Sequence, residues 1–484
     1  MKPEEQLMQE RLKKLQELRN SGVNPYPYKF NKTDFCNDVK EKYAEIKVGE
    51  EVNDKVSLAG RLMIVRDMGK IAFMELQDFT GRVQACVKRD DLPEDVYATF
   101  KKVDAGDWVG LTGTIFKTKT GEVTVKVKEL SLLSKSIRPL PEKWHGLKDV
   151  EIRYRHRSLD LMMNEQSRKT FLQRSQIIAA VREFFNSKGF LEVETPVLQP
   201  VYGGAEARPF LTHHNALDMD LYMRISPEIY LKRLLVGGFE KIYDINKNFR
   251  NEGVDTSHNP EFTMIEFYQA YADFYDMMDV VEELYNYTAK KIFGTTKFIW
   301  GSHQIDFKRP WERLSVVEAL KKHTKLDTEK MSEAELIKLV KQHHIQIEGK
   351  PTKAKMITAL FEELVEEKLI QPTFITHHFK ELSPLTKEDR KNPLFVERFE
   401  PFVCGMEIGN AYSELNDPVE QRKRFEEQAK ETGNPVDEDF LFALEHGMPP
   451  TGGVGLGIDR MVMLLTGATS IRDVILFPTM KIKK

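Results

Sequence analysis

The sequence predicts an α+β protein with two structural parts. Between about residues 51 and 135, five short strand-like segments alternate with glycine-containing turns, a pattern typical of a small closed β-barrel. From about residue 161 onward, long amphipathic helices are followed by strands with one polar face, which indicates a larger unit of helices and sheet. A chain of 484 residues also exceeds one ordinary hydrophobic core, so we expect separate domains.

The composition is that of an ordinary globular protein. The net charge is −3, so a nucleic-acid partner would have to be bound by a local basic surface. Cys36, Cys86 and Cys404 lie far apart, which argues against a disulfide framework or a zinc site. The charged N-terminus and the lack of an apolar run of about 18 residues predict a cytoplasmic protein without a membrane segment.

Residues 1–50 are predicted to form a helical extension before the barrel. Leu12, Leu15 and Leu18 follow helical spacing, and Gly22 is typical of a helix end. We expect this helix to dock on the next domain. Contact between its basic side chains and a phosphate backbone is the alternative.

The predicted barrel, residues 51–135, has the strand and turn pattern of an OB-type fold. Barrels of this type often bind oligonucleotides by stacking bases on exposed aromatic side chains beside polar groups. Phe73 and Gln84 are candidates for such a face. A plain β-barrel with Phe73 in its core is the alternative.

Residues 136–160 are predicted to link the two parts. The segment is basic and contains proline, and Arg153, Arg155, His156 and Arg157 cluster near its end. These side chains could face phosphate or form salt bridges between domains.

Two segments, KIYDINKNFRNE and EFTMIEFY, alternate between polar and apolar residues and predict neighbouring strands. Arg250 and Glu252 share one face of the first segment, and Phe262, Glu266 and Tyr268 share one face of the second. A solvated face of an amphipathic hairpin is the simple explanation. The phenylalanine among the charged residues favours a ligand site instead.

Three glutamates, Glu400, Glu407 and Glu414, are spaced seven residues apart. Seven is an odd number, so on one regular strand they would point to alternate faces. A turn near Gly405 and a break near Gly409 would place Glu400 and Glu407 on paired strands. Three unrelated surface acids are the alternative.

Two predicted helix starts carry charged side chains. Ser226 is expected to cap a helix whose first turn contains Glu228, where an acid is favoured by the helix dipole alone. A glycine-rich strand leads into a second helix near Asp459 and Arg460, so that an arginine and free backbone N–H groups could bind phosphate.

The chain resembles the class II lysyl-tRNA synthetases of bacterial type. GFLEVETPVL, FRNEG with HNPEFTMIEFY, and GLGIDR are similar to the three motifs of that family, in its order and spacing, and the resemblance covers nearly the whole chain. It implies an OB-fold anticodon-binding domain, with Phe73, Gln84 and Glu122 as candidate contacts. It also implies a catalytic domain at 161–484, built on an antiparallel sheet flanked by helices, with a helical insertion at about 312–370.

The resemblance implies a site for ATP. Arg250 would hold the α-phosphate and the amino acid carboxylate, and Arg460 would cover the adenine and bind the γ-phosphate. These two arginines are the catalytic candidates. Glu400 and Glu407 would bind Mg²⁺ together with ATP. The other residues implied to contact ATP are Glu252, His258, Asn259 and Phe262.

The resemblance also implies a pocket for lysine. Related aspartyl enzymes have an arginine at the position of Glu414, and an acid there reverses the preference toward an ammonium group. Buried carboxylates with no cation of their own are unfavourable until a cationic ligand arrives, so such a pocket would select lysine. The residues implied to bind lysine are Gly204, Glu228, Arg250, Glu266, Tyr268, Asn410, Tyr412 and Glu414.

The implied protein is a homodimer that activates L-lysine with ATP and transfers it to the 3′ end of tRNA(Lys). Three alternatives remain. A relative that attaches lysine-like groups to a protein would normally lack the barrel. A non-catalytic RNA-binding relative would be expected to lose Arg250 or Arg460, and an aspartyl or asparaginyl enzyme is disfavoured by Glu414.

Overall fold

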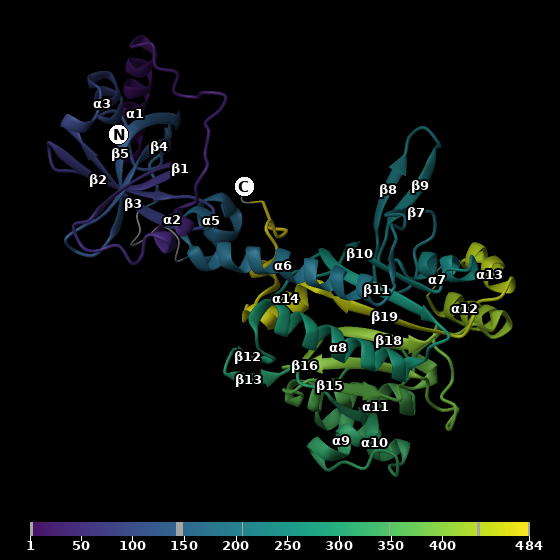
Figure 1. Cartoon of the computed structure of the whole chain (residues 1–484). Coiled ribbons are helices and arrows are strands. Elements are labelled where there is room, and N and C mark those ends of the chain that lie inside the picture. The colour runs from purple at the N-terminus through teal and green to yellow at the C-terminus, as the bar shows by residue number, and fades with distance from the viewer. Residues whose placement is uncertain (1–2, 142–148, 206, 348, 433–435, 483–484) are drawn as a thin grey trace. The chain divides into compact units, whose positions relative to one another are not determined.

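The structure is a computed structural model, and the chain forms two compact units, Met1–Gly146 and Leu147–Lys484 (Figure 1). Residues 142–148 of the predicted linker lie outside the described residues. The described residues are 3–141, 149–205, 207–347, 349–432 and 436–482.

The first unit contains the predicted five-stranded barrel of the OB type. The strands pair in the order β1-β2-β3-β5-β4, and β4 closes the barrel on β1. A short helix, α3 (Glu94–Phe100), lies between the third and fourth strands. Alternate strand residues fill the barrel interior, as the period of two requires. The strands are β1 (Glu51–Asp67), β2 (Ile71–Gln77), β3 (Arg82–Lys88), β4 (Trp108–Lys117) and β5 (Val123–Ser134).

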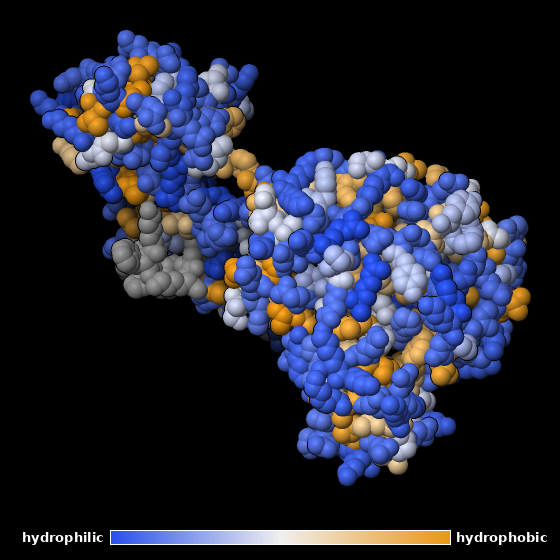
Figure 2. Space-filling model, turned by 60° about the horizontal axis from the view of Figure 1, so that its bottom comes forward, coloured by the Kyte–Doolittle hydropathy of each residue, from blue (hydrophilic) through white to orange (hydrophobic). Residues whose placement is uncertain are grey.

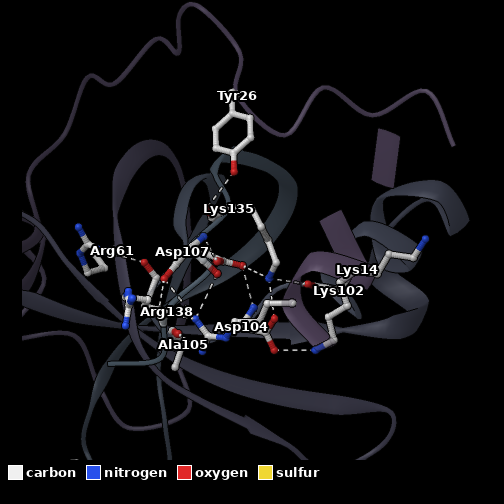
Figure 3. Close-up of polar contacts among 12 residues, drawn as sticks. Lys14, Tyr26, Arg61, Lys102, Asp104, Ala105, Asp107, Lys135 and Arg138 are labelled. Carbon is white, nitrogen blue, oxygen red and sulfur yellow. Dashed lines mark hydrogen bonds and ion pairs between the residues drawn. The ribbon is translucent and has the colours of Figure 1, made fainter. Parts of the chain in front are cut away.

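The helices before the barrel, α1 (Pro3–Asn20) and α2 (Cys36–Lys42), pack against it, as expected for the first. A buried ion-pair network holds α1 in place (Figure 3). The ammonium of Lys135 is fully buried between Asp104, at 2.5 Å, and Asp107, at 2.7 Å. Lys14 of α1 pairs with the same Asp104 at 2.6 Å.

The second unit is built on a nine-stranded sheet of order β14-β15-β16-β18-β19-β11-β10-β6, with β17 pairing to β16. The inner strands are antiparallel, as expected. The edge pairs β14·β15 and β10·β6 are parallel, and a parallel neighbour requires a long crossover connection, which helices supply here. The strands are β6 (Leu191–Glu192), β10 (Lys241–Phe249), β11 (Glu261–Ala270), β14 (Glu312–Ser315), β15 (Thr373–Thr376), β16 (Arg398–Val403), β17 (Met406–Glu407), β18 (Gly409–Ser413) and β19 (Thr451–Gly457).

Helices cover the two faces of this sheet differently. The main core forms where α6 (Glu165–Ser187), α8 (Phe274–Phe293) and α14 (Ile458–Thr466) pack against one face. On the opposite face α7 (Glu228–Val236) and α13 (Glu438–Glu445) pack near β10 and β11 only. The central strands therefore have one face free of packed helices.

The remaining elements are short. Helices α9 to α11 lie in the segment predicted to be a helical insertion, at about residues 312–370, which begins with strand β14 of the main sheet. They have a hydrophobic cluster of their own, joined by Ile375 and Phe402 of the sheet. Their bounds are α9 (Val316–Thr324), α10 (Glu333–Gln342) and α11 (Lys353–Leu364). The other elements are α4 (Val150–Arg155), α5 (Arg157–Met163), β7 (Leu198–Gln199), β8 (Phe210–His214), β9 (Met219–Met223), β12 (Lys297–Trp300), β13 (His303–Asp306), α12 (Pro418–Thr432), α15 (Ile471–Val474) and the 3₁₀ helices η1 (Arg89–Asp91), η2 (Glu366–Lys368) and η3 (Lys380–Leu382).

The basic cluster at residues 153–157 is engaged inside the second unit. Arg157 is buried, pairs with Asp160 at 2.6 Å and donates to the carbonyl of Leu476 at 2.7 Å. Arg153 reaches the same Asp160 at 2.8 Å. These two arginines stabilise the packing of α4 and α5, so neither is held for phosphate.

The surface seen in Figure 2 is mainly hydrophilic, with hydrophobic residues in small groups. All three cysteines are free thiols. Within the described residues, no helix is both long enough and apolar enough to cross a membrane.

Candidate active site

A cleft of about 700 Å³ opens on the helix-free face of the sheet in the second unit. Strand alternation explains its position, because the odd-numbered Ile265 and Phe267 of β11 enter the main core while their even-numbered neighbours face the cleft. All of the residues implied to bind ATP or lysine line it. They are Gly204, Glu228, Arg250, Glu252, His258, Asn259, Phe262, Glu266, Tyr268, Glu400, Glu407, Asn410, Tyr412, Glu414 and Arg460.

The predicted hairpin of β10 and β11 is present and in register. Asp244 pairs with Glu266, and Asn248 with Phe262. Arg250, just after β10, lies over the Phe262 ring with its guanidinium carbon 5.1 Å from the ring centroid. Its buried Nε has no hydrogen-bond partner among the described residues. This end of the cleft therefore holds a cation with a free donor, as an anionic ligand requires.

The loop between these strands supplies the residues at the rim. Glu252 and His258 are exposed, and His258 lies between Asp255, 2.8 Å from its Nδ1, and Arg460, 3.4 Å from its Nε2. Asn259 is buried. Its amide donates to the carbonyl of Glu261 and accepts from the backbone N–H of Thr479, so its side chain holds the loop in shape.

Glu400 and Glu407 lie on paired strands, as the odd spacing required. The chain turns at Cys404 and Gly405, which have φ angles of 53° and 70°, and β17 pairs back onto β16. Burial and the neighbouring Glu400 raise the pKa of Glu407 to about 7. A cation would relieve this crowding of carboxylates, so the pair fits a divalent metal ion that takes its other ligands from phosphate and water.

Three charged residues near these acids were not anticipated from the sequence. Arg398 donates to Glu400, and Asn410 reaches the same carboxylate at 3.1 Å. Glu362 and Glu366, from the insertion, also line the cleft, and burial with neighbouring carboxylates raises the pKa of Glu366 to about 8. Of these three residues, only Arg398 could have been found from the sequence, because it lies two residues before Glu400 on the same face of one strand. Across the described residues, no group of three or more histidine, cysteine or acidic side chains is arranged to hold a metal ion.

Glycines of β19 form the floor of the cleft. A Cβ atom at Gly453 would lie 2.1 Å from Oε1 of Glu414 and 2.4 Å from the Tyr268 ring. A Cβ atom at Gly455 would lie 3.0 Å from Met264. The absence of side chains lets the Glu414 carboxylate and the Tyr268 ring lie directly against the strand.

Arg460 reaches the cleft from the first turn of α14, close to the position expected for the start of that helix. Its guanidinium donates to the carbonyl of Glu407. The preceding Asp459 is buried and accepts from Arg174 at 2.5 Å and from the backbone N–H of Thr263 at 2.7 Å. These contacts attach the start of α14 to α6 and β11, and they fix the position of the helical turn that carries Arg460.

The opposite end of the cleft is acidic. Glu266 accepts from the Ser226 hydroxyl at 2.7 Å and from the Tyr268 hydroxyl at 3.0 Å. Burial, followed by the charge of Glu228, raises the pKa of Glu266 to about 8. Gly204 closes over this end with a φ of +84°, and a Cβ there would lie 2.9 Å from the Ser226 hydroxyl.

Two expectations for this end were wrong. The helix α7 begins at Glu228, so Pro227 and not Ser226 is its N-cap residue, although the Ser226 hydroxyl accepts from the backbone N–H of Glu228 at 3.1 Å while it donates to Glu266. The pocket also has a cation of its own, which the sequence analysis had excluded. Lys232 lies between Glu228 and Glu414, and it follows Glu228 by one helical turn.

The candidate nucleic-acid residues lie on the outer face of the barrel. Phe73 is half-buried, and its neighbours in sequence, Ala72 and Met74, fill the barrel core. Gln84 donates to the Thr124 hydroxyl at 2.9 Å. Oε1 of Glu122 lies 3.5 Å from Nζ of Lys40. Phe73 is thus outside the core cluster, contrary to the plain-barrel alternative.

Comparison with known proteins agrees with both units. A family model described as "tRNA synthetases class II (D, K and N)" matches residues 149–481. A second, described as "OB-fold nucleic acid binding domain", matches residues 56–133.

Relatives that carry the name lysine–tRNA ligase match the chain over nearly its full length. One from Clostridium perfringens is 51% identical and covers 99% of this chain and 98% of its own. One from Oceanobacillus iheyensis is 52% identical, with 98% of each chain covered. One from Thermosipho africanus is 50% identical, with 98% of this chain and 95% of its own covered. The chain therefore belongs to the class II tRNA synthetases and, within them, to the lysyl-tRNA synthetases of bacterial type.

Proposed function

We propose that the lysine–tRNA ligase activity of this chain is carried out in the cleft of the second unit, with ATP at its arginine end and lysine at its acidic end. The observation that supports this best is the polarity of the cleft. Arg250 and Arg460 lie at one end, and three buried carboxylates, Glu228, Glu266 and Glu414, lie at the other. A cationic amino acid would meet the three carboxylates, and a polyanionic nucleotide would meet the two arginines, with a metal ion to balance Glu400 and Glu407 at that end.

The first step joins lysine to the α-phosphate of ATP. The substrate carboxylate attacks that phosphorus, the bond to the β-phosphate oxygen breaks, and pyrophosphate leaves. The reaction needs no protein nucleophile, so the rate comes from alignment and charge neutralisation. Arg250 would hold both reacting groups, with Phe262 stacking on the adenine, and Arg460 would neutralise the γ-phosphate.

Glu400 and Glu407 would hold Mg²⁺ at the phosphates, where the ion offsets the charge of the leaving pyrophosphate. Glu252, His258 and Asn259 would shape the site for the base and the phosphates. Arg398 would keep the Glu400 carboxylate oriented, because it donates to that group in the structure.

At the acidic end, Glu414, Glu266 and Tyr268 would bind the ε-ammonium group of lysine. Glu228 and the backbone of Gly204 would receive the α-amino group, while Asn410 and Tyr412 would contact the remainder of the substrate. The burial of all three acids supports a cationic ligand at this end, because a buried carboxylate gains most from such a ligand.

In the second step a hydroxyl of the terminal tRNA ribose takes the lysyl group from the adenylate. We infer that the barrel binds the anticodon of tRNA(Lys) through its outer face, with Phe73, Gln84 and Glu122 as contacts. The presence of the barrel argues against a ligase that acts on a protein. It also gives the tRNA a binding surface apart from the cleft.

We also infer a homodimer in the cytoplasm. Leu191, Val197, Leu198 and Leu211, in and around the first motif, expose between 39% and 62% of their surface. A second copy of the chain would cover this apolar group, as is common for such patches.

Amino-acid-dependent exchange of labelled pyrophosphate into ATP, measured with each of the twenty amino acids, tests the proposal. We expect exchange with lysine and none with aspartate or asparagine. Exchange with aspartate, or with no amino acid, would overturn the assignment of the acidic end.

A further inference from the structure

Lys232 is fully buried between two carboxylates of the acidic end. Among the described residues, no other lysine or arginine lies between two acids of this end. Its Nζ lies 2.6 Å from Oε1 of Glu228 and 2.5 Å from Oε2 of Glu414, and none of the residue is exposed. Glu228 is one turn earlier on α7, whereas Glu414 follows β18. The ammonium therefore connects two elements that are far apart in the sequence.

The contacts leave part of each carboxylate for a ligand. Lys232 engages one oxygen of Glu228 and one of Glu414. Oε1 of Glu414 is buried, has no hydrogen-bond partner among the described residues, and faces the bare backbone of Gly453. A buried acceptor without a partner is unfavourable, so this oxygen is suited to an incoming ammonium group.

Lys232 also sets the net charge of the site. Glu228, Glu266 and Glu414 contribute three negative charges when ionised. Lys232 contributes one positive charge, and Arg250, which would hold the substrate carboxylate between the two ends of the cleft, contributes another. The site then has one net negative charge. Lysine, with two ammonium groups and one carboxylate, has one net positive charge. Without Lys232, the net charge of the site would be −2, and lysine would leave one negative charge unbalanced.

The charged and titratable groups around this pair come from three elements. Glu228 is on α7, Glu266 and Tyr268 are on β11, and Tyr412 is on β18, next to Glu414. Burial raises the pKa of Glu414, and the ammonium of Lys232 opposes that rise. The two carboxylates raise the pKa of Lys232 despite its burial, so this side chain stays charged.

We propose that Lys232 is a specificity-determining positioning residue, which orients Glu228 and Glu414 and matches the charge of the pocket to an amino acid of net charge +1. The proposal rests on the assignment of these two acids to the amino groups of the substrate. The alternative is an ion pair that only stabilises the fold.

Pyrophosphate exchange by Lys232→Met, with lysine and ATP varied separately, is the first test. We expect the KM for lysine to rise about tenfold or more, because both acids lose their orientation and their counter-ion, and the KM for ATP to change by less than about twofold. Arg233→Met is the matched control. It removes a positive charge from the next position of α7, where Arg233 lies over the Tyr230 ring, and should leave both constants near wild type.

A charge-specific measurement separates positioning from a general loss of structure. Lysinamide, with an amide in place of the carboxylate, has a net charge of +2, and we expect it to compete with lysine without reacting, because it has no carboxylate to attack ATP. The ratio of its Ki to the KM of lysine cancels defects that affect both ligands equally. We expect this ratio to fall about tenfold in Lys232→Met, where the site has a surplus negative charge. In Glu414→Gln, which has lost a negative charge, the ratio should rise.

The double variant Lys232→Met/Glu414→Gln keeps the test valid if Lys232→Met does not fold. It removes both charges of the pair, so the net charge of the site returns to its original value, and the ratio should return to wild type although lysine binds more weakly. If the ratio of the lysinamide Ki to the lysine KM were the same in the wild type and in every variant that folds, the proposal would be overturned. An unchanged KM for lysine in Glu414→Gln would instead overturn the pocket assignment of the proposed function.

Discussion

The hydroxyl of Tyr268 donates a hydrogen bond of 3.0 Å to Oε2 of Glu266, two residues earlier on the same face of β11. Both side chains are buried at the acidic end of the cleft. The phenol therefore positions a carboxylate that would otherwise be oriented only by Ser226.

Tyr268→Phe should raise the KM for lysine about tenfold and leave the KM for ATP unchanged. The variant removes a donor to a carboxylate, an interaction of about 1.5–3 kcal/mol. Pyrophosphate exchange measures both constants. Tyr271→Phe, at an exposed turn outside the cleft, is the control and should resemble wild type. Equal increases for the two substrates would show that Tyr268 supports the fold and not the pocket.

Lysine binding should strengthen as the pH rises from about 6.5 to 8.5. The pKa of Glu266 is about 8 in the empty cleft, so below that pH the carboxyl holds a proton that the ammonium ligand must expel. The affinity should therefore increase with pH, by up to about tenfold per unit, and level off above the pKa.

Calorimetric titration with lysine in buffers of different ionisation enthalpy would count the released proton directly. Glu266→Gln cannot release it and is the control. If the affinity of the wild-type protein for lysine fell as the pH rose, Glu266 would not be protonated in the empty cleft.

Gly453→Ala should weaken lysine binding more than ATP binding. The new Cβ would lie 2.1 Å from Oε1 of Glu414, a separation that forces the carboxylate or the strand to move. We expect a rise of about tenfold in the KM for lysine in pyrophosphate exchange, because one ligand of the ammonium is displaced. A variant with normal lysine binding would show that Glu414 moves without consequence.

Phe73→Ala should reduce tRNA charging while leaving pyrophosphate exchange intact. Stacking of a base on an aromatic ring contributes about 1–3 kcal/mol, so kcat/KM for tRNA should fall about 5- to 150-fold. Tyr28→Ala, which removes a fully exposed aromatic ring elsewhere in the first unit, is the control. Equal losses in charging and exchange would indicate damage to the whole protein.

Lys135→Met should destabilise the barrel by about 3–5 kcal/mol, because Asp107 would be left as a buried charge without its counter-ion and Asp104 would keep only Lys14. Hydrogen–deuterium exchange of peptides within residues 52–133 of the full chain measures this locally. Lys128→Met, which removes a partly exposed partner of Asp91 at 3.4 Å, should change exchange by far less. Similar protection in both variants would refute a stabilising role for the buried network.

The periodicity of the sequence predicted the strands of both units and, for β11, the face that lines the cleft. The period of two placed Glu266 and Tyr268 on one face of β11, and it placed Arg250 on the polar face of the preceding segment, directly after β10. The odd spacing of Glu400 and Glu407 predicted the turn at Cys404 and Gly405 in the same way. These are local properties, since the direction of a side chain follows from its position along one strand.

Contacts between distant segments were decided only by the tertiary structure. Glu362 and Glu366 approach Glu400 because the helices α9 to α11 fold back over the edge of the sheet. Lys232 meets Glu414 across 182 positions of the sequence. Its spacing from Glu228 was visible in the sequence, but an i,i+4 pair is equally common on solvated helices. Only packing of α7 against the sheet buries it, and burial is what gives its charge an influence on the pocket.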